Sequence, residues 1–231
     1  MSGTPSVSLI CFDLVGLVID GSVVERAFGE AIATQGIVSG TQSYTRAMVR
    51  FDRARGSSPA DVMHELFEEN DVRAAVATLA FDRSFRAAAE RFAITASPAF
   101  IAVLGKFSQA GVRACLVTTL SRGACGPLAY QMHQQGLADF VLCADDAPRG
   151  YPWPDIVLAA MLRAGVGDAR TVAMVSGTES GVQCGHRAGA GTVVGIADGS
   201  RRALELREAG ATDVVDGVDA VPELVLSSGA N

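Results

Sequence analysis

Five short runs of apolar residues recur along the chain, and each run is closed by small or acidic residues. The runs span 7–12, 114–118, 140–143, 171–175 and 192–196. Their brevity and β-branched content are typical of strands that are buried on both faces of a parallel sheet. Segments of helical length lie between the later runs, at 121–135, 154–164 and 181–188. From about residue 97 onward, the alternation predicts an α/β fold with a doubly wound parallel sheet.

The stretch from 22 to 92 has a different pattern. It lacks a clear strand, is rich in Ala, Arg, Glu and Phe, and carries apolar residues at helical spacing. Ser58 precedes Pro59 after a Gly-Ser turn, which is typical of a capped helix start. We therefore predict a core of residues 1–21 and 93–231 and an all-helical cap of residues 22–92. Because ligands bind at the carboxyl ends of strands in open α/β sheets, a cap inserted after the first strand is expected to form a lid.

Composition and charge narrow the class of protein. The chain has 231 residues, of which 49% are hydrophobic and 19% charged, and this excludes disorder. The net charge of −6 and the pI of about 5.1 argue against a nucleic-acid partner. No run approaches the roughly 18 apolar residues of a membrane span. The five cysteines form no CxxC pair, so we expect no zinc site and a reduced, cytoplasmic setting.

Asp13 is the first candidate for chemistry. It stands at the end of the first predicted strand, before a turn that contains Gly16. A turn or helix-capping role is one interpretation. An acidic residue at this point of a buried strand is better explained by a site at the switch point of the sheet.

The run CFDLVGLVIDG at 11–21 resembles the first motif of the haloacid dehalogenase (HAD) superfamily, whose first Asp is a covalent nucleophile. The run VVERAFGEAIATQGI at 23–37, the helical cap at this place and the run VQCGHRAGAGTVVGIADGS at 182–200 are similar to the phosphonoacetaldehyde hydrolase-like branch. The resemblance covers nearly the whole chain. It implies a HAD-like Rossmannoid core with a small helical cap inserted after strand 1.

Only some of the family's catalytic residues have counterparts in this chain. Asp13 matches the nucleophile, and Thr118 matches the hydroxyl of the second motif, which would contact an oxyanion. Val15 stands where most phosphatases of the family have an acid/base Asp, although the phosphonatase branch tolerates Ala there. Tyr151 stands where relatives have Lys or Arg, and Arg149 is two residues away.

The metal-binding motif has lost its carboxylates. In relatives, a GDxxxD run holds Mg²⁺, whereas this chain has Gly177 and Gly181 at the two acidic positions. Mg²⁺ prefers octahedral oxygen ligands, usually carboxylates together with water and phosphate. Without the metal, an ionised Asp that attacks a phosphate dianion meets uncompensated repulsion. We therefore expect no metal and no cofactor, with Mg²⁺ held by Glu179 or Asp146 as the alternative.

A phosphonatase mechanism is disfavoured separately. The resemblance implies that this reaction needs a lysine in the cap to form a Schiff base. Lys106 is the only lysine, and it lies outside the cap on a predicted surface helix.

These observations lead to one main hypothesis. We expect a HAD-fold enzyme repurposed for metal-independent chemistry on a small molecule. Asp13 would act as nucleophile or general acid/base, with Thr118 and Tyr151 as further catalytic residues. The expected substrate-binding residues are Thr119, Arg149, Ser176, Glu179 and Arg50.

Two alternatives stay open. One is a non-catalytic pseudoenzyme that serves as a binding or interaction module. The other is a Mg²⁺-dependent hydrolase with substitute metal ligands. A homodimer through the cap is compatible with the pattern, and no membrane partner is expected.

Overall fold

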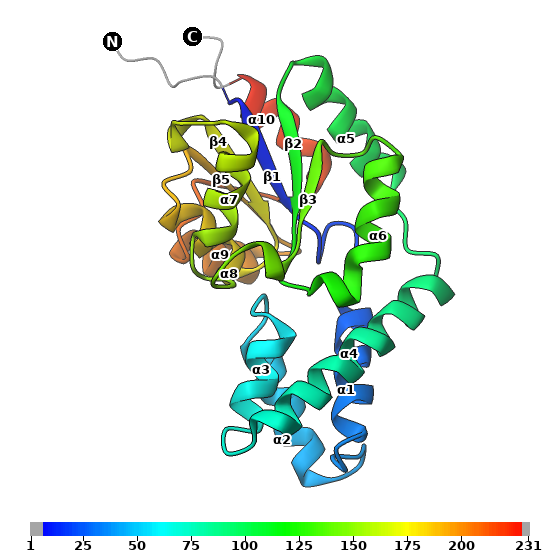
Figure 1. Ribbon diagram of the computed structural model, residues 1–231. Helices are drawn as coiled ribbons and strands as arrows, with labels where there is room; N and C mark the ends of the chain where they lie inside the picture. The colour runs from blue at the N-terminus through cyan, green and yellow to red at the C-terminus, as the bar shows by residue number, and fades with distance from the viewer. Residues whose placement is uncertain (1–6, 228–231) are drawn as a thin grey trace.

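A six-stranded parallel sheet forms the centre of the computed structural model, which describes residues 7–227 (Figure 1). The spatial order of the strands is β3-β2-β1-β4-β5-β6, and every neighbouring pair is parallel. The strands are β1 (Leu9–Asp13), β2 (Arg113–Val117), β3 (Phe140–Leu142), β4 (Val172–Ser176), β5 (Thr192–Ile196) and β6 (Asp213–Val215). The predicted doubly wound sheet is confirmed. The edge strand β6 was not predicted, because its three half-buried residues leave almost no pattern.

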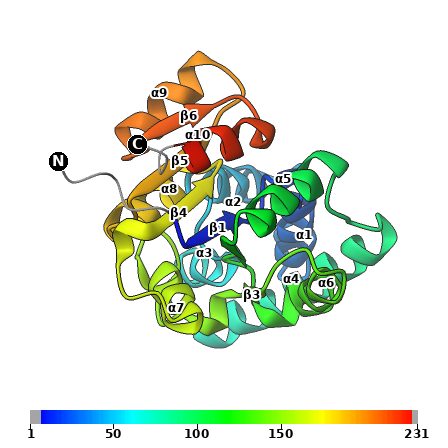
Figure 2. The same ribbon diagram turned by 90° about the horizontal axis from the view of Figure 1, so that it is seen from above.

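Helices cover both faces of the sheet (Figure 2). One face carries α5 (Pro98–Gln109), α6 (Arg122–Gln134) and α10 (Val221–Ser227), and the other carries α7 (Asp155–Ala164), α8 (Glu179–Arg187) and α9 (Ser200–Glu208). Alternation along β1 serves both layers. Ile10 and Phe12 belong to the core under α5, while Leu9 and Cys11 belong to the core under α7.

The segment between β1 and α5 contains only helices as regular structure. These are α1 (Gly21–Ala33), α2 (Gln42–Arg53), α3 (Pro59–Leu66) and α4 (Asp71–Arg91), and they lie beyond the carboxyl ends of the strands (Figure 1). Ser58 caps α3 by accepting a hydrogen bond from the Asp61 N–H, as the sequence predicted. We refer to α1–α4 as the cap. The domain boundaries at residues 22 and 92 stay a prediction.

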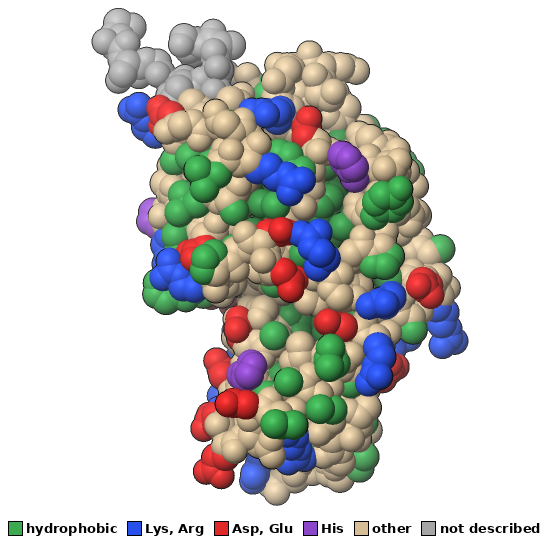
Figure 3. Space-filling view, in the orientation of Figure 1, with side chains coloured by type: hydrophobic (Ala, Val, Ile, Leu, Met, Phe, Trp, Pro, Cys, Tyr) green, Lys and Arg blue, Asp and Glu red, His purple; other side chains and the backbone are tan. Residues whose placement is uncertain are grey.

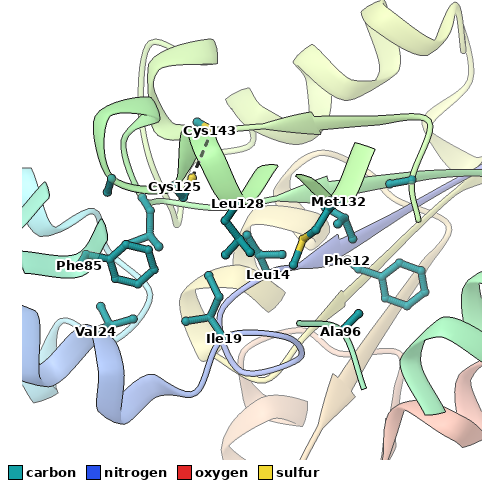
Figure 4. Packing of buried hydrophobic residues seen from close by; sticks show 14 of the residues in the cluster. Phe12, Leu14, Ile19, Val24, Phe85, Ala96, Cys125, Leu128, Met132 and Cys143 are labelled. Carbon is teal, nitrogen blue, oxygen red and sulfur yellow. Dashed lines mark hydrogen bonds between the residues drawn. The ribbon is translucent and has the colours of Figure 1, made fainter. Parts of the chain in front are cut away.

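One hydrophobic cluster runs from the sheet into the cap. It includes Phe12, Leu14, Ile19, Val24 and Phe85. Figure 4 shows these side chains lying one after another between the end of β1 and the cap helices. The cap therefore rests on the core through apolar contacts as well as through the chain connections.

The surface of this fold has mixed charge. On the face drawn in Figure 3, acidic and basic side chains are interspersed over both the sheet half and the cap. Within residues 7–227, no helix has both the length and the apolar character that crossing a bilayer requires.

Phe100 provides a test of the core on the α5 side. Its ring is fully buried and meets the Phe12 ring edge-on at 5.2 Å between centroids. We expect Phe100→Ala to lower the free energy of unfolding by about 3–5 kcal/mol, because a cavity replaces the ring. Urea denaturation measures this loss. Ile101→Ala, at a half-exposed neighbour in the same helix, is the matched control and should cost far less.

Candidate active site

Asp13 ends the central strand β1 and is only 2% exposed. The chain turns directly after it, and Gly16 adopts a φ of +92° in that turn, a conformation that favours glycine. The Asp13 carboxyl has two partners. Its Oδ2 accepts a hydrogen bond of 2.8 Å from the Ser176 hydroxyl, and its Oδ1 accepts one of 3.3 Å from the Val15 N–H.

The surroundings of Asp13 bring the pKa of its carboxyl close to 7. Burial raises the pKa of Asp13 from 3.8 to about 7, although the hydrogen bonds from Ser176 and Val15 lower it. Within residues 7–227, no cationic side chain is among the causes of this pKa shift. At neutral pH the carboxyl is therefore present in both its protonated and its ionised form, which suits an acid/base group.

Ser176 lies at the end of β4 and is held in a small network of hydroxyl groups. Its Oγ lies 3.1 Å from the Thr178 hydroxyl and accepts a hydrogen bond of 3.1 Å from the Thr178 N–H. Thr178 is the N-cap of α8 and accepts a hydrogen bond from the Gly181 N–H. Because the neighbouring groups fix the Ser176 oxygen, its hydrogen bond to Asp13 is preorganised.

Tyr151 has an unpaired hydroxyl and interacts electrostatically with Asp13. The side chain is 3% exposed, and its Oη is the one fully buried side-chain N or O atom without a hydrogen-bond partner in the described part of the chain. Burial raises the pKa of Tyr151, and the charge of Asp13 raises it further. Tyr151 is therefore a neutral phenol whose donor and acceptor capacity is free for a bound molecule.

The loop that carries Tyr151 is held from outside by Trp153. The Trp153 ring lies between two guanidinium groups, with Arg149 at 4.6 Å and Arg187 at 5.3 Å from its centre. Arg149 also forms a bidentate ion pair with Asp155. Arg149, which the sequence placed among the substrate-binding residues, is thus engaged in holding this loop.

Thr118 and Thr119 follow β2 on the other side of β1. Thr118 is fully buried, and its hydroxyl accepts a hydrogen bond of 3.1 Å from the Leu120 N–H. The Thr119 hydroxyl lies 3.5 Å from the Ser57 carbonyl oxygen, which belongs to the cap. The structure therefore gathers Asp13, Ser176 and the two threonines at the carboxyl ends of three adjacent strands.

A short cap loop, residues 54–58, packs against the site. Gly56 has a φ of +85°, and a Cβ at this position would lie 2.0 Å from the Ser180 oxygen and 2.8 Å from the Thr178 hydroxyl oxygen. Ser180 also donates a hydrogen bond of 2.8 Å to the Arg55 carbonyl. With Ser57 near Thr119 and Gly56 against Thr178, this loop packs on residues next to the Asp13 site.

A polar cleft of about 580 Å³ opens between the cap loop and the start of α8. Its walls carry mostly charged and amide side chains, among them Arg53, Arg55, Glu179, Gln183, Asp198 and Arg202. Asp13 does not line this cleft, although Ser57 and Ser180, which contact neighbours of the Asp13 site, do.

Two other predicted substrate-binding residues have partners of their own. Glu179 lines the cleft but forms an ion pair of 3.0 Å with Arg202. Arg50 donates a hydrogen bond to the Glu65 carbonyl and pairs with Glu68, so it is engaged within the cap. Among the cap arginines, Arg53 and Arg55 line the cleft instead.

The donor set around Asp13 does not fit Mg²⁺. A Cβ at Gly181 would lie 2.2 Å from the Ser176 oxygen, so the Ser176 hydroxyl fills the space in which an acidic side chain at 181 would begin. Asp146, the other substitute ligand considered, pairs with Arg122. No group of three or more His, Cys, Asp or Glu side chains suited to a metal occurs within residues 7–227. A single carboxylate with hydroxyl neighbours is a poor match for the ligands that this cation prefers.

Sequence reasoning missed three residues that shape the site. Gly56 and Ser180 join the cap loop to α8, and Arg202 donates a hydrogen bond to the Gly177 carbonyl while it pairs with Glu179. The Gly-Ser-Ser-Pro run was a signal for a tight turn at Gly56. No local signal marks Ser180 or Arg202, because their partners are distant in sequence.

Comparison with known proteins gives a consistent result. A family model described as haloacid dehalogenase-like hydrolase matches residues 7–189. Phosphonoacetaldehyde hydrolase of Pseudomonas fluorescens is 35% identical over 69 residues, which are 30% of this chain and 25% of that protein. The enzyme of the same name from Bordetella pertussis is 29% identical over 112 residues, 48% of this chain and 41% of that protein. The chain thus spans less than half the length of these curated relatives.

Solved structures agree on the fold. A phosphonoacetaldehyde hydrolase-like protein from Oleispira antarctica superposes with a TM-score of 0.80 at 20% identity, covering 100% of this chain and 95% of that one. A β-phosphoglucomutase-like protein from Bacteroides vulgatus gives 0.75 at 18% identity, covering 98% and 91%. At these identities the likeness concerns the fold alone.

The raised pKa of Asp13 predicts a pH-dependent cost in stability. The folded state holds the Asp13 proton up to a pH of about 7, whereas the unfolded chain releases it near 3.8. The contribution of Asp13 to the free energy of unfolding is therefore fully present below pH 4 and is lost as the pH rises to about 7. Asp13→Asn removes the titration, so its stability relative to wild type should increase over this range by up to about 4 kcal/mol. Urea unfolding at pH 4 to 9 measures the difference. A difference that does not change with pH contradicts the assignment.

The packing of the cap loop against α8 predicts that alanine substitutions at two glycines have different effects on the pKa of Asp13. Gly56 and Gly40 both have a φ of +85°, but a Cβ at Gly40 would meet nothing within 4 Å. Gly56→Ala should unseat the loop, admit water and move the pKa of Asp13 down toward its ordinary value. Gly40→Ala carries a similar backbone strain and should leave that pKa unchanged. Carboxyl-carbon NMR titration, with Asp13→Asn to assign the signal, measures both. Equal effects of the two variants would contradict the role of the loop.

Proposed function

From the premise that this chain belongs to the haloacid dehalogenase-like hydrolase family, we propose that it is an enzyme of that fold that works without a metal ion. It acts on a small molecule held beneath the cap, and Asp13 is its reactive carboxyl. The hydrogen bond from Ser176 to Asp13 carries this proposal, because the Ser176 oxygen takes the space that an acidic side chain at 181 would need.

General acid/base catalysis is the role of Asp13 that its environment supports best. A carboxyl with a pKa of about 7 exchanges a proton readily at neutral pH. Ser176 stabilises the ionised form by donating a hydrogen bond, and the hydrophobic burial of β1 stabilises the protonated form. The nucleophilic role differs in one observable respect, since it passes through an ester between Asp13 and the substrate.

Tyr151 and Thr118 are the other two catalytic residues of the proposal. The free Tyr151 hydroxyl would donate a hydrogen bond to a substrate oxygen that gains negative charge. Thr118 would supply a further polar contact at the end of β2. Tyr151 lies where a cation would be found in relatives, so this site stabilises charge by hydrogen bonding instead of by a full positive charge.

The electrostatics favour a substrate with an uncharged reacting group. Burial and two hydrogen bonds, and no described cation, determine the pKa of Asp13, so an ionised Asp13 would repel a phosphate dianion placed directly beside it. The curated relatives are named for phosphonoacetaldehyde hydrolysis. The Schiff-base lysine that the resemblance associates with that reaction has no counterpart in the cap, since Lys106 is exposed on α5. Small esters and 2-halo acids fit the proposal better than phosphate or phosphonate esters.

A non-catalytic role is the second candidate, and the seated cap loop is the observation that favours it. Asp13 is 2% exposed, and residues 54–58 pack against Thr178 and Ser180 next to the Asp13 site, so this conformation admits no substrate to the carboxyl. A module that binds a partner through the outer cleft would need no access to Asp13. Turnover that depends on Asp13 distinguishes the two functions.

Replacement of Asp13 tests the proposed function. Wild type, Asp13→Asn and Asp20→Asn are assayed with a panel of uncharged esters, 2-halo acids and phosphate monoesters, each with Mg²⁺ and with EDTA. Asp13→Asn should lower kcat/KM by at least about 100-fold, since the proton-transferring group is gone. Asp20 is exposed and caps α1, a role that Asn fills equally well, so Asp20→Asn is the matched control and should retain activity.

The accompanying conditions separate the alternatives. EDTA should leave the rate unchanged, and the pH profile should have an inflection near pH 7 that Asp13→Asn removes. Turnover of phosphate monoesters that EDTA abolishes would identify a metal-dependent enzyme. Turnover in H₂¹⁸O that labels the Asp13 carboxyl would assign the nucleophilic role. Absence of Asp13-dependent turnover across the panel would overturn the proposal in favour of a binding module.

A further inference from the structure

Cys125 and Cys143 form a close pair of thiols outside the site of Asp13. Their sulfur atoms lie 3.4 Å apart, within hydrogen-bond distance for sulfur, and both side chains are buried. Cys125 lies in the first turns of α6, and Cys143 follows the end of β3. Figure 4 shows the two sulfur atoms facing each other between these elements.

We propose that Cys125 and Cys143 are a redox modification site, at which a peroxide converts the two thiols reversibly into a disulfide. A disulfide requires about 2.05 Å between the sulfur atoms, so a shift of little more than 1 Å along the existing contact suffices. Cys143 stands in an irregular segment that can supply this shift, since a short 3-10 turn, Ala144–Asp146, follows it directly.

The neighbouring groups make the two thiols chemically unequal. The hydrogen bond from Cys125 lowers the pKa of Cys143, and the positive charge of Arg122 lowers it further, whereas burial acts in the opposite direction. The hydrogen bond to Cys143 and burial raise the pKa of Cys125. Cys143 is therefore the thiolate that reacts first, and Cys125 is the resolving thiol.

The reaction balances with one peroxide molecule. The Cys143 thiolate attacks a peroxide oxygen, the O–O bond breaks, and Cys143 becomes a sulfenic acid while hydroxide leaves and is protonated to water. The Cys125 sulfur then attacks the Cys143 sulfur, the S–O bond breaks, and a second water leaves with the Cys125 proton. Two thiols are oxidised to a disulfide, and hydrogen peroxide is reduced to two molecules of water.

The pair lies at a place that the cap touches. Ser121, the N-cap of α6, donates a hydrogen bond to Asp82 of α4. Arg86 of α4 donates another to the Gly123 carbonyl, two residues before Cys125. A disulfide would tie this turn of α6 to the end of β3 and so fix the surface on which α4 rests.

A competing pair provides an internal comparison. Cys11 and Cys115 face each other in register on β1 and β2. Burial raises the pKa of Cys115 well above its ordinary value, and the neighbouring Cys11 raises it further, although the charge of Arg163 acts in the opposite direction. The proposal therefore predicts selective oxidation of Cys125 and Cys143.

Tryptic peptide masses test this selectivity on the intact protein. Cleavage after arginine places Cys125 and Cys143 together in the peptide 123–149, while the other three cysteines fall on three different peptides. After brief hydrogen peroxide treatment and alkylation of free thiols in denaturant, peptide 123–149 should lack two hydrogen masses and carry no alkyl group. The other cysteines should be alkylated, and dithiothreitol should restore all five thiols.

Variants determine the order of the steps. In Cys125→Ser, the resolving thiol is missing, so dimedone should trap a sulfenic acid on Cys143. In Cys143→Ser, Cys125 should stay unmodified. Cys184→Ser, which removes a buried cysteine without such a partner, should still form the disulfide. The thermal midpoint of oxidised wild type should rise by several degrees and return on reduction, because the cross-link constrains the unfolded chain. Fully alkylated cysteines in peroxide-treated wild type, or a Cys11–Cys115 cross-link, would overturn the proposal.

Discussion

The constraint on which the rest of the site depends is a carboxyl group buried at the end of the central strand with a single hydroxyl donor beside it. Burial alone would hold Asp13 protonated, and a full set of hydrogen bonds or a cation would hold it ionised. The hydrogen bond from Ser176 offsets part of the effect of burial, and the result lies near neutrality. The oxygen that performs this role stands where a metal-binding side chain would otherwise begin. The same hydroxyl thus lowers the pKa of Asp13 and fills the space beside Gly181.

The environment of the Asp13 carboxyl depends on the conformation of the cap loop. Residues 54–58 belong to the cap, yet they contact Thr119 after β2 and Ser180 in α8. We therefore expect the protonation of Asp13 to depend on the position of the loop, since an unseated loop would admit water and favour the ionised carboxyl. The apolar cluster from Phe12 through Leu14 to Phe85 holds the rest of the cap against the core on the opposite side of this contact.

Much of the fold could be predicted from the sequence, because it depends on patterns within short segments. Buried β-branched runs mark five of the six strands, and the strand-tip position of Asp13 and Thr118 follows from them. The partners of long side chains could not be predicted in this way. Arg149 could extend toward Tyr151 or away from it, and the choice depends on Trp153 and Asp155 being placed beside it by the fold. The filling of the space at Gly181 by Ser176 likewise depends on how α8 leaves β4, which a motif comparison does not contain.

The loop of Tyr151 also carries the only tryptophan of the chain. Trp153 is half-exposed and lies between the guanidinium groups of Arg149 and Arg187. Indole emission depends on the charges and solvent next to the ring, so all tryptophan fluorescence of the protein originates two residues from the unpaired phenol. The molecule thus contains its own optical probe, which reports on this loop without a label and without knowledge of the substrate.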